Sequence, residues 1–176
     1  MATKRPVWVF FGVLVISVWV LGATIRAGAE TLNFKFFSHV TRSEVFPVGD
    51  FEGHDVGINV REGAVILASG ELAWMRAINS SDTVRGATTI TTTDQYYTVT
   101  FQDGSTITAH TRVRSETTPG KGGTGKWAGE ITNGTGRFKG IKGTAAAEIK
   151  FIPRAKDELG PKALGEATFN YTLPSK

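Results

Sequence analysis

The chain has 176 residues with a net charge of +4, 40% hydrophobic residues and no cysteine. Three of its 20 basic residues lie before residue 30, in a stretch without acidic residues, which leaves 17 basic against 16 acidic residues beyond it. This near-neutral balance disfavours nucleic acid as a partner. The missing cysteines exclude disulfides, thiolate metal sites and thiol nucleophiles.

The N-terminal segment has the layout of an export signal. Lys4 and Arg5 precede an uncharged apolar run at residues 7–25, and Ala27-Gly28-Ala29 follows it. A basic start, an apolar middle and a small-residue exit are typical of a signal peptide, here cleaved after Ala29. The run is also long enough for a short membrane span, so an uncleaved anchor helix is the alternative. We therefore expect residues 30–176 to form one domain that is secreted, periplasmic or tethered to the membrane through residues 7–25.

Beyond this segment the sequence favours strands. Runs rich in β-branched and aromatic residues alternate with polar ones and are separated by Gly, Asn, Asp and Pro. Seven or eight short strands at such spacing predict an all-β barrel or sandwich. The expected strands are residues 32–40, 63–69, 72–78, 88–101, 106–113, 126–132, 145–152 and 163–173.

Few residues in the first half of the domain are candidates for chemistry. His54 and Asp55 are adjacent in FEGHDVGINVREG and could form an acid/base dyad, or simply belong to a polar surface loop. Glu71 lies in the mostly apolar stretch ILASGELAWMRAI. If it points into a barrel lumen, desolvation would raise its pKa and suit acid/base catalysis, whereas at a strand start beside Gly70 it would be solvated.

Binding chemistry is equally sparse. Trp74 and Arg76 share a face of the following strand and could stack on a ligand or on each other. The three histidines are dispersed and form no ligand pair at the usual spacing, so we expect no metal site. Nothing in the sequence indicates a cofactor.

One hairpin can be predicted to the residue. A three-residue loop at residues 102–104 would place Gly104 in the left-handed conformation that such loops favour. A slip of one residue would pair apolar with polar side chains, so the pattern selects one register. We expect the pairs Val99–Ile107 and Tyr97–Ala109 on one face, and Thr98–Thr108, Tyr96–His110 and the ion pair Asp94–Arg112 on the other.

The stretch GKGGTGKWAG, residues 120–129, looks like a phosphate-binding loop. Such a loop needs a buried strand before it, a helix after it, and Ser or Thr after its lysine to bind magnesium. Here Trp127 follows Lys126, the polar RSETTP precedes the loop, and WAGEITNGTG holds too many turn formers for a helix. We therefore reject a nucleotide site. The motif GTGKWAG recurs as GTGRFKG eleven residues later, and we interpret both copies as turns at strand ends with an aromatic plug.

A family resemblance emerges from the second copy. ITNGTGRFKGIKGTAAAEIKF, residues 131–151, resembles the glycine-rich signature of the allene oxide cyclase barrel and the related dirigent proteins. YYTVTFQDGSTITAH resembles the hairpin of that family, and residues 49–73 resemble exported bacterial members of unassigned activity. The resemblance implies an eight-stranded antiparallel, calycin-like β-barrel with an apolar lumen, assembled as a trimer or dimer. The cyclase's N-terminal motif with its catalytic glutamate is not found, so no catalytic residue is carried over.

These observations leave three functional readings. We favour an exported barrel that binds a small apolar or amphipathic molecule in its lumen. One alternative is a cyclase-like isomerase that uses a lumen carboxylate such as Glu71. The other is a structural oligomer whose lumen is filled by its own side chains. The candidate ligand-binding residues are Phe34, Phe36, Trp74, Arg76, Tyr97, Phe101 and Phe138.

Overall fold

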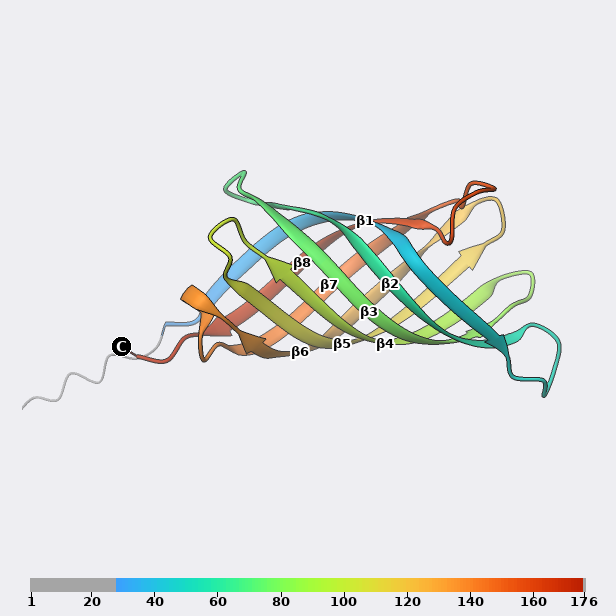
Figure 1. Ribbon diagram of the computed structural model, residues 1–176, viewed down its shortest axis with the longest axis horizontal. Coiled ribbons are helices and arrows are strands. Elements are labelled where there is room, and N and C mark those ends of the chain that lie inside the picture. The colour runs from blue at the N-terminus through green and yellow to red at the C-terminus, as the bar shows by residue number, and fades with distance from the viewer. Residues whose placement is uncertain (1–27, 176) are drawn as a thin grey trace, which may run out of the picture.

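The computed structural model describes residues 28–175, which form one closed barrel of eight antiparallel strands in sequence order (Figure 1). The segment predicted to be a signal or anchor lies almost wholly outside these residues. No helix within residues 28–175 has the length and apolar character of a membrane span. The strands are β1 (Glu30–Pro47), β2 (His54–Leu67), β3 (Leu72–Val84), β4 (Thr89–Thr100), β5 (Thr106–Thr118), β6 (Gly122–Gly134), β7 (Lys142–Ile152) and β8 (Lys162–Thr172).

The predicted barrel is confirmed, and all eight predicted strands exist. β1 closes the barrel against β8, with Phe34 opposite Ala167. Several strands are longer than expected. β2 begins at His54, nine residues before the predicted start, and β1 extends to Pro47 past a bulge between Val40 and Arg42. Both extensions were missed because their inward positions are partly polar, which weakens the apolar alternation that marks a strand.

The β4–β5 hairpin has the predicted register. Tyr97 lies opposite Ala109, Tyr96 opposite His110 and Asp94 opposite Arg112. Gly104 adopts a φ of +78°, which supplies the left-handed residue of the three-residue loop. The Arg112 Nε lies 3.4 Å from Asp94 Oδ1, so the ion pair is also confirmed.

One end of the barrel is closed by aromatic side chains. A short 3-10 helix, η1 (Gly136–Phe138), follows β6 and buries Phe138. The Phe138 ring lies 4.8 Å from that of Phe101 and 6.1 Å from that of Tyr171, and we call these three residues the aromatic plug. The Arg137 guanidinium lies 4.6 Å from the Phe101 ring centre and covers the plug.

The two glycine-rich copies have different roles. The second copy forms the turn with η1 and its aromatic plugs the barrel end, as predicted. The prediction for the first copy is wrong, because residues 123–129 lie inside β6 and Trp127 points into the lumen. Residues 119–121 form only a tight turn between β5 and β6, with no helix behind it, which agrees with the rejection of a phosphate loop.

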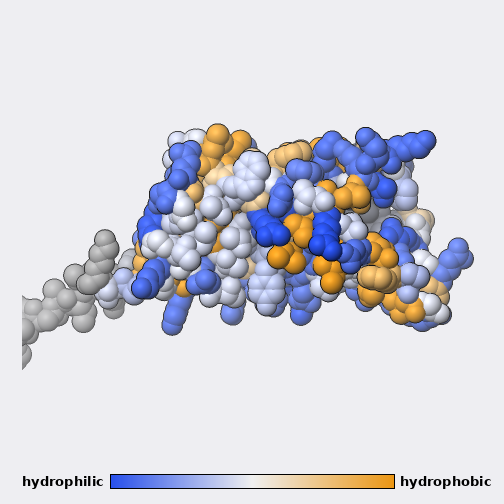
Figure 2. All heavy atoms as spheres, in the orientation of Figure 1, coloured by the Kyte–Doolittle hydropathy of each residue, from blue (hydrophilic) through white to orange (hydrophobic). Residues whose placement is uncertain are grey.

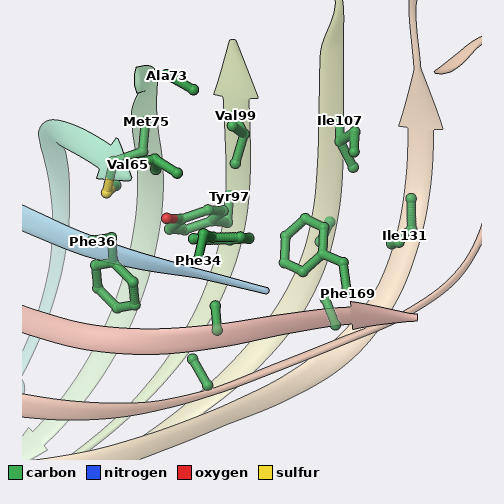
Figure 3. Close-up of a cluster of buried hydrophobic side chains, with 14 of the residues drawn as sticks. Phe34, Phe36, Val65, Ala73, Met75, Tyr97, Val99, Ile107, Ile131 and Phe169 are labelled. Atoms are coloured by element: carbon green, nitrogen blue, oxygen red, sulfur yellow. The ribbon is translucent and has the colours of Figure 1, made fainter. Parts of the chain in front are cut away.

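The half of the lumen next to the plug is packed by apolar side chains (Figure 3). Phe169 from β8 is fully buried and its ring lies 5.1 Å from that of Phe34 on β1. Met75, Val99 and Ile107, which are neighbours on β3, β4 and β5, are buried in the same core. This half is a solid hydrophobic core, as small barrels require.

Candidate functional site

The other half of the lumen contains a cavity of about 320 Å³. Its lining reaches the ends of the strands near the β3–β4 and β7–β8 connections. In Figure 1 these connections lie at the opposite end of the barrel from the turn that follows β6. That volume is at the lower end of the range for small-molecule sites, roughly 300–1,000 Å³. We call it the polar cavity.

Aromatic and aliphatic side chains form the base of the polar cavity. The Tyr97 ring lies 5.4 Å from Trp127 and 6.0 Å from Phe36, so three strands contribute one aromatic surface. Met75 and Ile149 complete it. Such a surface favours flat, apolar parts of a ligand because it offers large contact area and stacking geometry.

A row of three amide side chains and one hydroxyl, which we call the amide row, crosses the barrel wall next to this base. The strand register places Asn59, Asn79, Gln95 and Thr111 next to one another on β2, β3, β4 and β5. The Asn79 Nδ2 donates to Asn59 Oδ1 at 2.8 Å, and the Gln95 Nε2 donates to Thr111 Oγ1 at 3.0 Å. On β3, β4 and β5 the inward side chains therefore change from apolar to polar between the row that holds Tyr97 and the row that holds Gln95.

Two buried polar atoms at this boundary have no partner within residues 28–175. They are the Tyr97 hydroxyl and the Asn79 Oδ1. Burial raises the pKa of Tyr97 far above its ordinary value, so this group stays a neutral hydrogen-bond donor. Leaving such groups unpaired costs roughly 1–3 kcal/mol each, and a ligand or a bound water that pairs them recovers that energy.

Arginine supplies the charge of the polar cavity. Arg61 on β2 reaches neutral oxygens, with Nε donating to Ser38 Oγ at 3.3 Å and Nη2 to the Pro161 carbonyl at 2.7 Å. Desolvation lowers the pKa of Arg61 to about 10. Arg85 and Arg154 also line the cavity, and Arg85 is paired with Asp55 at 2.5 Å. No Asp or Glu is among the lining residues of the described chain.

No family model and no curated protein matches this sequence. A solved structure of a pterocarpan synthase dirigent protein is similar to this chain, with 20% identity and a TM-score of 0.46. The match covers 84% of this chain and 92% of the other. The likeness is one of fold only, and the resemblance to the cyclase and dirigent families beyond the fold stays a prediction.

The predicted ligand-binding residues divide into four groups. Phe36 and Tyr97 line the polar cavity, Phe34 belongs to the packed core, and Phe101 and Phe138 belong to the plug. Trp74 and Arg76 do share a face, but it is the outer face of β3, where Trp74 is 59% exposed. Their predicted place in the lumen is wrong, because alternate residues of a strand point to opposite sides and Ala73, Met75 and Ala77 take the inward positions.

The predicted acid/base residues lie outside the polar cavity. Glu71 precedes β3 beside Gly70, as in the solvated reading, and pairs with Arg137 at 3.5 Å on the plug side. His54 is the first residue of β2, so it does not belong to the predicted surface loop. The predicted dyad with Asp55 is also wrong, because the His54 ring contacts two other carboxylates. Its Nδ1 lies 2.8 Å from Asp50 and its Nε2 lies 3.3 Å from Asp82. Asp55 instead pairs with Arg85.

Sequence reasoning missed Arg61, Asn79 and Trp127. A usable signal was present on β2, where Asn59 and Arg61 are in phase with the inward Val65 and Leu67 at a period of two. Polar residues in phase with apolar ones indicate a strand that enters a polar part of the lumen. No group of three or more His, Asp or Glu within residues 28–175 is placed to hold a metal ion.

Proposed function

We propose that this barrel binds a small amphipathic molecule in its polar cavity. The observation that carries the proposal is the half-filled lumen. An aromatic base, a row of amides and two unpaired polar atoms surround about 320 Å³ of space. A preformed, mostly apolar concavity with a few fixed polar groups is the usual form of a small-molecule site. The layout of residues 1–29 supports export of the protein, which is part of the proposal.

The energetics favour an occupant with both apolar and polar parts. Apolar ligand surface placed on Tyr97 and Trp127 gains about 25 cal/mol per Å² removed from water. A polar ligand atom near the Tyr97 hydroxyl or Asn79 Oδ1 would satisfy a group that has no hydrogen-bond partner within residues 28–175. A purely apolar ligand would leave these groups unpaired and would desolvate the amide row without compensation.

The other two readings receive less support. A cyclase-like reaction through a lumen carboxylate would need an acid in the cavity lining, and the lining residues of the described chain contribute arginines instead. The reading as a structural oligomer requires a lumen filled by side chains. The half of the lumen next to the plug fits this requirement, but the half beyond Tyr97 contains the polar cavity.

Native mass spectrometry of the full chain, purified from its own host in the form that the host produces, tests the proposal. We expect a small molecule bound to the folded protein and released by denaturation. A matched pair of variants locates it. Thr91→Trp places an indole in the cavity, whereas Thr92→Trp places one on the outer face of the same strand.

We expect Thr91→Trp to lose the bound molecule and Thr92→Trp to keep it. Circular dichroism and thermal melting of both variants control for misfolding. A molecule that remains bound in Thr91→Trp, or one lost equally from both folded variants, would contradict binding in the lumen.

A further inference from the structure

We propose that Arg61 is the anchor for an anionic group, a carboxylate or its equivalent, on the molecule that the polar cavity binds. This inference rests on the proposed function and names the class of ligand. It follows from the hydrogen bonds of Arg61, from the charges around it and from its place in the lumen.

The guanidinium of Arg61 is only partly used by the protein. A guanidinium has five N–H donors in a rigid fork. Its Nε and Nη2 donate to Ser38 and to the Pro161 carbonyl, which holds the side chain in place. Nη1 has no hydrogen-bond partner within residues 28–175, and it is not among the atoms that are both buried and unpaired. Arg61 lines the cavity, so Nη1 is an unused donor on a side chain that borders this space.

Within residues 28–175, no carboxylate balances the charge of Arg61. All its protein partners are neutral oxygens, and no acid of the described chain lines the cavity. The neighbouring acid on β2, Glu62, points outward and pairs with Arg76 at 3.6 Å. Buried charges are normally paired, since an unpaired charge in a desolvated site is costly. An anionic ligand is the partner that the site lacks.

The position of Arg61 indicates the rest of the ligand. The register places Arg61, Ala77 and Tyr97 in one row across β2, β3 and β4, so Arg61 and Tyr97 are two strands, or roughly 10 Å, apart. The small Ala77 leaves room between them. A flat ring system on Tyr97 and Trp127 would direct a carboxylate toward the Arg61 fork. The volume of about 320 Å³ favours a compact ring acid over a long chain.

The test uses 2-naphthoate and its neutral isostere 2-naphthamide as probes of the full chain. Calorimetry gives their dissociation constants. The indole N–H signals in nuclear magnetic resonance spectra report the place of binding, with Trp127 inside the lumen and Trp74 outside it. The full chain has four tryptophans, so these two signals are assigned through Trp74→Phe and Trp127→Phe. We expect both probes to shift the Trp127 signal and not that of Trp74, and naphthoate to bind about tenfold more tightly or better.

Substitutions then isolate the charge. Arg61→Met should weaken naphthoate binding by about tenfold or more and change naphthamide binding by less than about twofold. Arg61→Lys should keep part of the preference, because the charge remains while the fork is lost. Arg76→Met, on the outer face of β3, is the matched control and should change neither affinity.

Two results would overturn the inference in different ways. If naphthamide shifts Trp127 and binds as tightly as naphthoate, and Arg61→Met affects neither, the cavity binds ligands but Arg61 is no anion anchor. If neither probe shifts Trp127 in the folded wild-type protein, binding of compact aromatic ligands in the lumen is itself contradicted, and the inference falls with it.

Discussion

His54 joins three parts of the barrel at the end opposite the plug. Its Nδ1 contacts Asp50 in the β1–β2 connection, its Nε2 contacts Asp82 on β3, and its ring stacks on Phe51 at 4.8 Å. The hydrogen bond to Asp50 is the main cause that raises the pKa of His54 above the ordinary value of 6.5, and the charge of Asp82 adds to it. A single side chain thus couples the connection to the barrel wall through its protonation.

We expect the pKa of His54, measured by nuclear magnetic resonance titration, to lie above 6.5. Because the folded-state pKa is raised, protonated His54 stabilises the fold fully below pH 6.5, and this contribution is lost as the pH rises through the folded-state pKa. Asp50→Asn should move the titration midpoint down and reduce the effect of pH on the melting temperature. A wild-type midpoint at or below 6.5 would contradict this account.

At the scale of elements, a glycine inside a strand lets two neighbouring strands approach closely. A Cβ on Gly63 of β2 would lie 1.8 Å from the carbonyl oxygen of Phe37 on β1. The obstacle is backbone, which cannot move without breaking the β1–β2 ladder near its bulge. Gly104, in contrast, has open space around it, and only its positive φ disfavours a side chain. The two glycines are therefore required for different reasons.

Alanine substitutions separate these two requirements. We expect Gly104→Ala to lower the free energy of unfolding by about 1–2 kcal/mol, the cost of a left-handed non-glycine residue. Gly63→Ala should cost at least about 3 kcal/mol, since the overlap with a strand carbonyl forces the wall apart. Urea denaturation monitored by circular dichroism gives both values. Equal losses would show that the β1–β2 contact relaxes easily.

At the scale of the whole molecule, aromatic contacts across the lumen tie the barrel together. Phe169 on β8 is fully buried and lies near Phe34 on β1, Tyr97 on β4 and Trp127 on β6. These strands are spread around the barrel, so one ring connects opposite walls. The outer surface also carries apolar side chains among polar ones (Figure 2), such as Phe37, which is 38% exposed.

Phe169→Ala should therefore destabilise the protein far more than Phe37→Ala. We expect a loss of about 3–5 kcal/mol for Phe169, because the cavity left behind borders three strands. The loss for Phe37 should stay below about 1 kcal/mol, as for a surface side chain. Thermal and urea unfolding of both variants provide the comparison. Similar losses would mean that the outer face is buried, for instance between copies of the chain.

The sequence by itself determined the all-β class, the existence of eight strands and the register of the β4–β5 hairpin. These depend on contacts close in sequence, where alternation and a glycine at the right loop position are sufficient. It also identified Phe36 and Tyr97 as lumen residues, although the same reasoning placed Trp74 in the lumen wrongly.

Only the tertiary structure decided which side chains share the cavity. Trp74 is as aromatic as Trp127, yet one lies outside and the other inside, because each strand's phase is set by its neighbours. Arg61 meets the Pro161 carbonyl from the β7–β8 connection, 100 residues away. Whether an arginine has a carboxylate beside it depends on how distant strands are brought together, and within residues 28–175 no carboxylate lines the cavity beside Arg61.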